Sequence, residues 1–147
     1  MSWNDIMIPT KNELNQSHSK KIEESKTQFE INKNKLDDAI NDLRKSIMTE
    51  IKDKLEKTID NISYRNYANY QQIKILFASI YPKIHNHPLV IIDMFPVIYN
   101  YEMNKKLNRI DNIIFYIMQP IITKLKEHNY DIEVVKDGSY YYKITWG

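Results

Sequence analysis

The chain has 147 residues, and its 21 Lys and Arg against 19 Asp and Glu give a formal net charge of +2. That balance excludes a strongly cationic protein, whose charge alone would attract nucleic acid or an anionic membrane. The absence of cysteine excludes disulfides, thiolate nucleophiles and cysteine-ligated zinc.

Targeting signals are not evident in the sequence. Residues 1–10 lack the basic and apolar regions of a signal peptide, and no apolar run approaches the roughly 18–20 residues that span a bilayer. We therefore expect no membrane insertion, no secretion by a signal peptide, and a reducing location in a cytoplasm or a virion. Ile, Lys, Asn and Tyr supply 68 of the 147 residues, a bias typical of AT-rich codons. It points to a large DNA virus, a phage or an AT-rich microbe as the source.

Residues 1–9 are predicted to be an N-terminal arm, and a long helical segment is predicted over residues 10–81. No Gly or Pro occurs between Thr10 and Tyr81, and these two residue types are the main interruptions of local structure. Thr10 and Glu13 have the spacing of a capping box, in which each side chain bonds the other residue's backbone N–H. The spacing predicts that the helix begins at Thr10.

A seam of apolar residues runs along the middle of this segment at helical spacing. Its steps of 4, 3, 4, 4, 4, 4 and 3 residues include two 11-residue intervals, from Ile40 to Ile51 and from Ile51 to Ile62. That rhythm favours a straight, coiled-coil-like helix lying along its neighbours. Before the seam, Lys26 and Lys33 occupy core positions, so residues 10–35 are predicted to be helical only with a partner's help. The seam comprises Leu36, Ile40, Leu43, Ile47, Ile51, Leu55, Ile59 and Ile62.

The seam has two possible neighbours. It packs either on the second half of this chain or on another chain. A helix of 72 residues would be about 108 Å long, which exceeds the diameter of a small domain. This length favours partner binding, and we predict that the seam binds protein partners, either copies of the same chain or other subunits of an assembly.

The end of the long segment is aromatic. Apolar residues continue there at helical spacing, and we predict that they pack on the C-terminal half of the chain. A base-stacking surface for nucleic acid is the less favoured alternative. The residues are Tyr64, Tyr67, Tyr70, Ile73, Phe77, Ile80 and Tyr81.

Residues 82–129 are predicted to form an apolar helical segment. Pro82 and Pro88 bracket a break, and the following apolar stretch contains Pro96, which should kink or split a helix. A regular helical pattern then runs from Leu107 to Leu125. We expect Asn129 to take a left-handed conformation just after this helix ends.

Residues 130–147 are predicted to form an antiparallel β-hairpin. A two-residue turn at Asp137-Gly138 would pair Val134 with Tyr141 and scatter the apolar side chains over both faces. A three-residue loop with Gly138 in a left-handed conformation pairs Val134 with Tyr140 and gathers them on one face. We prefer this second register, which also places Asp131 opposite Lys143 and leaves both strand edges open. The packing face is then Tyr130, Ile132, Val134, Tyr140, Tyr142, Ile144 and Trp146.

Residues that carry chemistry are sparse. His85, His87 and Asp93 could surround a metal, but a His-x-His before a proline is more often a polar loop and helix cap, so no metal site is predicted. No nucleophile elbow, dinucleotide fingerprint or phosphate-binding loop occurs. We therefore predict a protein that is not an enzyme and needs no cofactor.

The sequence favours a mainly α structural or assembly protein that docks or oligomerises through its long helix. With the AT-rich composition, a virion or phage component is the most concrete form of this hypothesis. The alternative is a nucleic-acid-binding protein whose helix and hairpin act like a winged helix. Against it, the helix before the hairpin is apolar where a recognition helix needs polar side chains, and the hairpin loop offers only Lys136.

Overall fold

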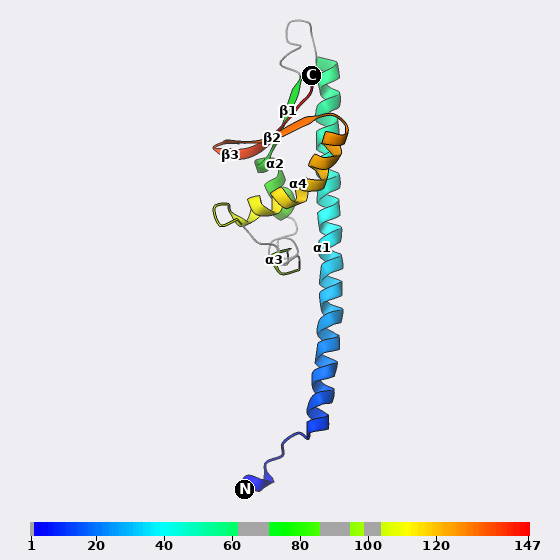
Figure 1. Cartoon of the computed structure of the whole chain (residues 1–147), viewed down its shortest axis with the longest axis vertical. Coiled ribbons are helices and arrows are strands. Elements are labelled where there is room, and N and C mark those ends of the chain that lie inside the picture. The colour runs from blue at the N-terminus through cyan, green and yellow to red at the C-terminus, as the bar shows by residue number, and fades with distance from the viewer. Residues whose placement is uncertain (1, 62–70, 86–94, 99–103) are drawn as a thin grey trace.

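A computed structural model describes residues 2–61, 71–85, 95–98 and 104–147. A long helix, α1 (Lys11–Asn61), carries a compact head along its C-terminal half, and its N-terminal half extends beyond the head (Figure 1). The predicted mainly α fold with a long N-terminal helix and a C-terminal hairpin is confirmed. The head comprises β1 (Gln72–Leu76), α2 (Phe77–His85), α3 (Phe95–Ile98), α4 (Arg109–Glu127), β2 (Asp131–Asp137) and β3 (Ser139–Thr145).

The start of α1 is fixed by a capping box, as predicted. The Glu13 N–H donates to Oγ1 of Thr10 at 3.2 Å, and the Thr10 N–H donates to Oε2 of Glu13 at 3.4 Å. Two backbone donors that a helix start leaves unpaired are thus satisfied reciprocally. The preceding arm contains a short 3₁₀ turn, η1 (Trp3–Asp5).

The predicted position of the end of the long helix was wrong. α1 ends at Asn61, and residues 72–76 form strand β1 instead of continuing the helix to Tyr81. Ile73 and Ile75 alternate with polar Gln72 and Lys74, a period-2 pattern that the helical spacing of the aromatic stripe concealed. The pattern becomes a strand because β3 provides hydrogen-bonding partners about 70 residues further along the chain. Tyr64, Tyr67 and Tyr70 lie outside the described residues.

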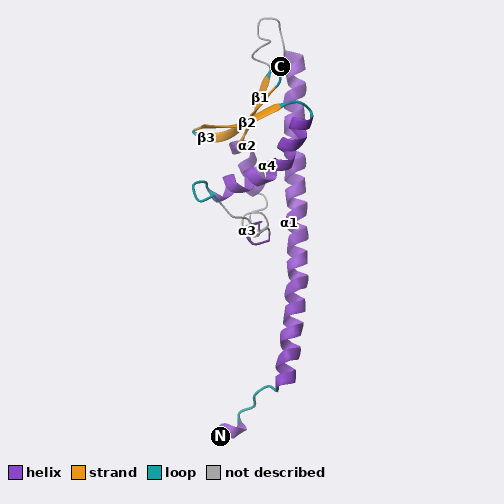
Figure 2. Cartoon of the chain, viewed as in Figure 1, coloured by secondary structure: helices purple, strands orange, loops and turns teal. Residues whose placement is uncertain are grey.

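The three strands lie on one side of α1 (Figure 2). They form one antiparallel sheet in the order β1-β3-β2. The hairpin therefore does not have two open edges, because β1 covers the outer edge of β3. Neither predicted register is correct: Val134 pairs with Tyr142 and Ile132 with Ile144. This pairing differs from the preferred one by two residues, and an even shift keeps every side chain on its predicted face. The left-handed conformation of Gly138, with φ of 73°, is confirmed.

The register shift changes the ion pair on the other face of the sheet. Glu133, rather than Asp131, lies opposite Lys143, and the Lys143 ammonium is 3.6 Å from the Glu133 carboxylate. On the packing face, Tyr142 and Ile144 are buried on the central strand, whereas Val134 on the edge strand β2 is 42% exposed. Val134 thus lies on the predicted face of the hairpin, but this edge position leaves it only partly covered.

The core of the head is aromatic where the sheet meets α2 and α4. Phe77 lies 5.2 Å from Phe115 and 5.4 Å from Tyr142, measured between ring centroids. Tilted and edge-to-face pairs of this kind stabilise a core beyond the area that they bury. Burial also raises the pKa of Tyr142. The aromatic residues of α2 and the hairpin thus pack within the chain, as predicted.

Helix α4 contains Pro120 without ending there. Proline has no N–H and weakens the helical hydrogen bonding around the preceding turn. In that turn, the carbonyl of Ile117 accepts a 3.0 Å hydrogen bond from Nε of Arg44 on α1. Arg44 thereby ties the long helix to the proline-containing turn of α4. After α4 ends, Asn129 has the predicted left-handed conformation, with φ of 67°.

Candidate interaction surfaces

The apolar seam of α1 lies in the core of its own chain. Its first five members, Leu36, Ile40, Leu43, Ile47 and Ile51, are buried in the same hydrophobic cluster as the residues of α2, α4 and the sheet, and Leu55 packs against that cluster. These side chains are not free to bind another chain, so their assignment to a partner interface is corrected. The alternative, a helix packed on its own domain, describes this part of α1.

The end of the seam behaves differently from its beginning. Ile59 is 73% exposed, and it lies in the last turn of α1, which ends at Asn61. Ile62, the last residue assigned to the seam, lies outside the described residues. Of the eight predicted partner-binding residues, Ile59 is thus the one whose described side chain is open to a partner.

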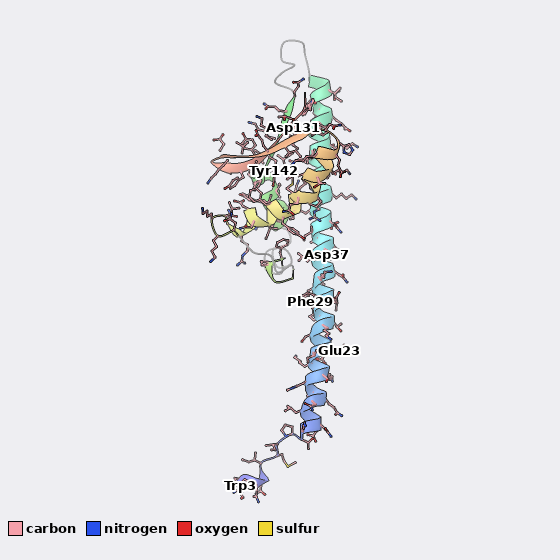
Figure 3. All side chains as sticks on the ribbon, in the orientation of Figure 1. Trp3, Glu23, Phe29, Asp37, Asp131 and Tyr142 are labelled. Carbon is pink, nitrogen blue, oxygen red and sulfur yellow. The ribbon has the colours of Figure 1, made fainter. Side chains whose placement is uncertain are left out.

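The N-terminal half of α1 is exposed over most of its length. We call residues 11–35 the free half of α1. All described side chains from residue 2 to residue 31 are exposed, and Phe29 and Glu23 lie on the part of the helix that extends beyond the head (Figure 3). Among residues 11–35, Asn32 and Lys33, which adjoin the seam, are half-buried.

An apolar stripe follows one face of the free half. It consists of Leu14, Ile22 and Phe29, with exposed fractions of 45%, 55% and 43%. At 3.6 residues per turn, these positions lie on the same face as the buried Leu36, Ile40 and Leu43. The stripe therefore continues the face that packs against the head, but here the face is uncovered.

The N-terminal arm is also apolar and exposed. Trp3, Ile6, Met7 and Ile8 each expose more than 60% of their surface, and Trp3 stands at the far end of the molecule from the head (Figure 3). Single exposed apolar residues are ordinary, but several in a row mark a surface that another molecule covers. The arm and the stripe together make the N-terminal third of the chain the most exposed apolar part of the described structure.

An apolar groove of about 470 Å³ lies at the other end of α1. It is formed where α1, the end of α4 and the last strand meet, and Leu55, Ile59, Leu125, Tyr130 and Trp146 line it. Tyr130 and Trp146, two of the predicted packing residues, meet edge to face at 6.0 Å. Sequence reasoning missed this groove because its walls come from segments far apart in the chain.

A buried polar cluster joins α2 to the start of α4. The Asp111 carboxylate accepts a 2.6 Å hydrogen bond from the Tyr81 hydroxyl and a 3.0 Å bond from the Asn108 amide. Burial, together with the hydrogen bond and charge of Asp111, raises the pKa of Tyr81 to about 12. The Asp111 N–H in turn donates to Oδ1 of Asn108, the N-cap of α4. These hydrogen bonds cap the start of α4 and join it to α2.

Metal and membrane sites find no support among the described residues. No group of three His, Asp or Glu side chains in the described ranges is placed to hold a metal ion, although His87 and Asp93 of the possible metal motif lie outside those ranges. None of the described helices is long and apolar enough to cross a membrane.

The chain was compared with protein families, curated proteins and solved structures. No family model, curated protein or solved structure matches it. The surfaces described above are consequently the basis on which a function can be proposed.

Proposed function

We propose that this chain is a non-enzymatic structural protein that attaches to other subunits of an assembly through the free half of α1. The composition of the chain supports a virus or phage particle as that assembly. The observation that carries the proposal is the apolar stripe of Leu14, Ile22 and Phe29 on a helix that extends beyond the head.

The stability of the free half supports this proposal. Isolated helices with few apolar contacts are marginal in water, and most helical stability in proteins comes from packing of an apolar face. Here the described interactions within the free half are local: the capping box, the weak surface pair Lys26–Glu23 at 3.8 Å, and side-chain hydrogen bonds between residues one turn apart. A helix of this kind gains its stability when a partner covers the stripe.

The burial of the seam changes which part of α1 can dock on a partner. The sequence assigned partner binding to residues 36–62, but residues 36–55 serve the chain's own core. The part left to dock is the free half, together with the exposed arm. The head then anchors the docking helix, because the second half of the same helix is part of its core.

The nucleic-acid alternative stays a prediction and has weaker support. Helix α4, which would have to be the recognition helix, buries eight of its residues in the head. Recognition helices present polar side chains to base edges. The hairpin loop region contributes Lys136, whose ammonium lies 5.5 Å from the ring centroid of Tyr140.

Site-specific crosslinking in the organism that produces the chain tests the proposed function. A phenylalanine analogue that crosslinks under ultraviolet light is placed at position 29, on the stripe, or at position 31, on the opposite face. Phe29 and Ile31 are equally exposed, at 43% each, so they form a matched pair. We expect a discrete crosslinked protein from position 29 and much less from position 31.

The result that would sink the proposal is equally concrete. If position 29 yields no crosslinked protein, or the same products as position 31, the stripe is not a docking surface. Identification of the crosslinked species by mass spectrometry also distinguishes a copy of this chain from a different subunit.

A further inference from the structure

We propose that the partner of the free half of α1 is an acidic amphipathic helix, whose apolar seam is flanked by Glu or Asp, and not a second copy of this chain. This inference rests on the proposed function, because it names the chemistry of the partner that docking requires. It follows from where the charged residues of the free half lie around the stripe.

Lysines flank the stripe, and the glutamates lie farther from it around the helix. At about 100° per residue, Lys11, Lys21, Lys26 and Lys33 lie within about 75° of the centre line through Leu14, Ile22 and Phe29. All four glutamates of residues 11–35 lie more than about 110° from that line. The glutamates are Glu13, Glu23, Glu24 and Glu30.

The described structure shows the lysines beside the apolar side chains. Lys21 and Lys26, one on each side of Ile22, line a shallow hollow together with Ser25, Phe29 and, at its margin, Glu30. Lys26 is 3.8 Å from Glu23, and both side chains are exposed. An exposed ion pair of this kind contributes little to stability, so the Lys26 ammonium can leave Glu23 and pair with a carboxylate of the partner.

These positions decide partner choice in paired helices. The residues that flank an apolar seam face the flanking residues of the other helix, and their charges set which helices pair. An acidic helix would place carboxylates against Lys21, Lys26 and Lys33 while its apolar seam covers Ile22 and Phe29. The 25 residues of the free half extend over about 37 Å, which accommodates a helix of comparable length.

A second copy of this chain fits poorly. Two stripes laid against each other, in either direction, bring lysines against lysines, and like charges at these positions are destabilising. His18 lies between Leu14 and Ile22, and Ser25 lies between Ile22 and Phe29, so the apolar contact of two copies would also be thin. The flanking charges therefore act against self-association.

A polyanion such as nucleic acid is also a weaker fit. The free half holds six lysines and four glutamates, which sum to +2, and phosphate binding needs a dense positive surface. Moreover, a polyanion would leave Ile22 and Phe29 uncovered. The combination of apolar centre and basic flanks suits an acidic helix better.

Two synthetic peptides of about four heptads test the proposal against the full chain. Both carry the same Ile and Leu seam; one has Glu at the flanking positions and the other has Lys. Fluorescence anisotropy of the labelled peptides measures Kd at low and at physiological salt. We expect the Glu peptide to bind at least about tenfold more tightly than the Lys peptide, with the difference shrinking as salt rises.

Matched variants locate the effect on the helix. Lys21→Glu with Lys26→Glu, beside the stripe, should weaken binding of the Glu peptide by about tenfold and improve binding of the Lys peptide. Lys20→Glu with Lys35→Glu makes the same change in net charge away from the stripe and should have a much smaller effect. Phe29→Ser should weaken binding of the Glu peptide, whereas Ile31→Ser should not.

Several outcomes would overturn the proposal. They are equal affinity for the two peptides, no binding of the Glu peptide up to millimolar concentration, or equal effects of the two lysine pairs. A stable dimer at low salt that Phe29→Ser dissociates would assign the stripe to a second copy. Tight binding of single-stranded DNA that Phe29→Ser leaves unchanged would assign it to nucleic acid. If crosslinking from position 29 still captures a different protein that lacks an acidic helix, the docking function stands and the acidic partner alone is rejected.

Discussion

The Tyr81 hydroxyl donates a 2.6 Å hydrogen bond to Oδ1 of Asp111, and this contact joins α2 to the first turn of α4. Asp111 is buried. Without the Tyr81 hydroxyl, the described side-chain donor left to its carboxylate would be the Asn108 amide. A buried carboxylate that loses a donor pays a desolvation penalty. The contact therefore fixes how the two helices meet.

The first prediction follows from this contact. Tyr81→Phe should lower the free energy of unfolding by about 1–3 kcal/mol, because it removes the donor while retaining the ring. Urea unfolding followed by circular dichroism measures the change. Tyr140→Phe is the control: it keeps the ring contacts with Phe77 and Phe115 and should change stability much less. Equal losses in the two variants would contradict the role assigned to the Tyr81 hydroxyl.

The same contact predicts an alkaline pH dependence. The pKa of Tyr81 is about 12 in the folded chain against an ordinary value of 10.0, so the folded state retains a proton that the unfolded state releases. The stabilisation is fully present below pH 10 and is lost as pH rises from about 10 to about 12. Tyr81→Phe should therefore flatten the fall in stability between pH 9 and about 11.5. Tyr142 contributes to the same fall because burial raises its pKa too, so Tyr81→Phe should remove only part of the pH dependence. A fall in stability as steep in Tyr81→Phe as in the unchanged chain would contradict the prediction.

The second prediction concerns the seam as part of the core. Ile47 is fully buried and Ile59 is 73% exposed, although both belong to the same helical pattern. Ile47→Ala should cost about 2–5 kcal/mol, because it leaves a cavity in a packed core. Ile59→Ala should stay within about 0.5 kcal/mol. Chemical denaturation of the two variants measures this contrast. If Ile47→Ala lowers the free energy of unfolding as little as Ile59→Ala, the seam is not part of the core and its partner-binding role is restored.

The third prediction concerns the contact between Arg44 and the proline-containing turn of α4. Arg44→Ala should destabilise the chain by about 1–3 kcal/mol, since it removes the donor to the Ile117 carbonyl and the contact with the Tyr116 ring. Arg44→Lys should restore little of this, because an ammonium does not reproduce the planar guanidinium. Thermal unfolding checks both variants. Lys45→Ala, at an exposed neighbouring position, should be nearly neutral, and full rescue by Lys would show that charge alone matters.

The fourth prediction separates the two halves of α1 by hydrogen exchange. Backbone amides of residues 14–30 should exchange quickly in the isolated chain, whereas those of residues 40–51 should approach the protection of global unfolding. The reason is that the side chains of residues 14–30 are all exposed, while the second half buries its seam. Exchange followed by mass spectrometry measures both segments. Equal protection along α1 would mean that the free half is already covered, for instance by another chain.

The sequence by itself determined those features whose physical cause is local. The Thr10–Glu13 capping box, the helical spacing from Leu36 to Leu55 and the left-handed Asn129 and Gly138 each depend on residues within a few positions of one another. The two faces of the hairpin followed as well, because side chains alternate along a strand regardless of register. The exposed stripe could also have been placed on one face with its flanking lysines from spacing alone.

Only the tertiary structure decided what each face meets. Whether residues 72–76 continue a helix or form a strand depended on β3, which lies about 70 residues away and provides the hydrogen bonds. The hairpin register depended on the fit of its central strand between two neighbours. Whether the seam of α1 binds a partner or its own head could not be read from spacing, because an apolar face specifies that it will be buried and not by what. The head covers that face from Leu36 to Leu55, and the same face is left uncovered over Leu14, Ile22 and Phe29.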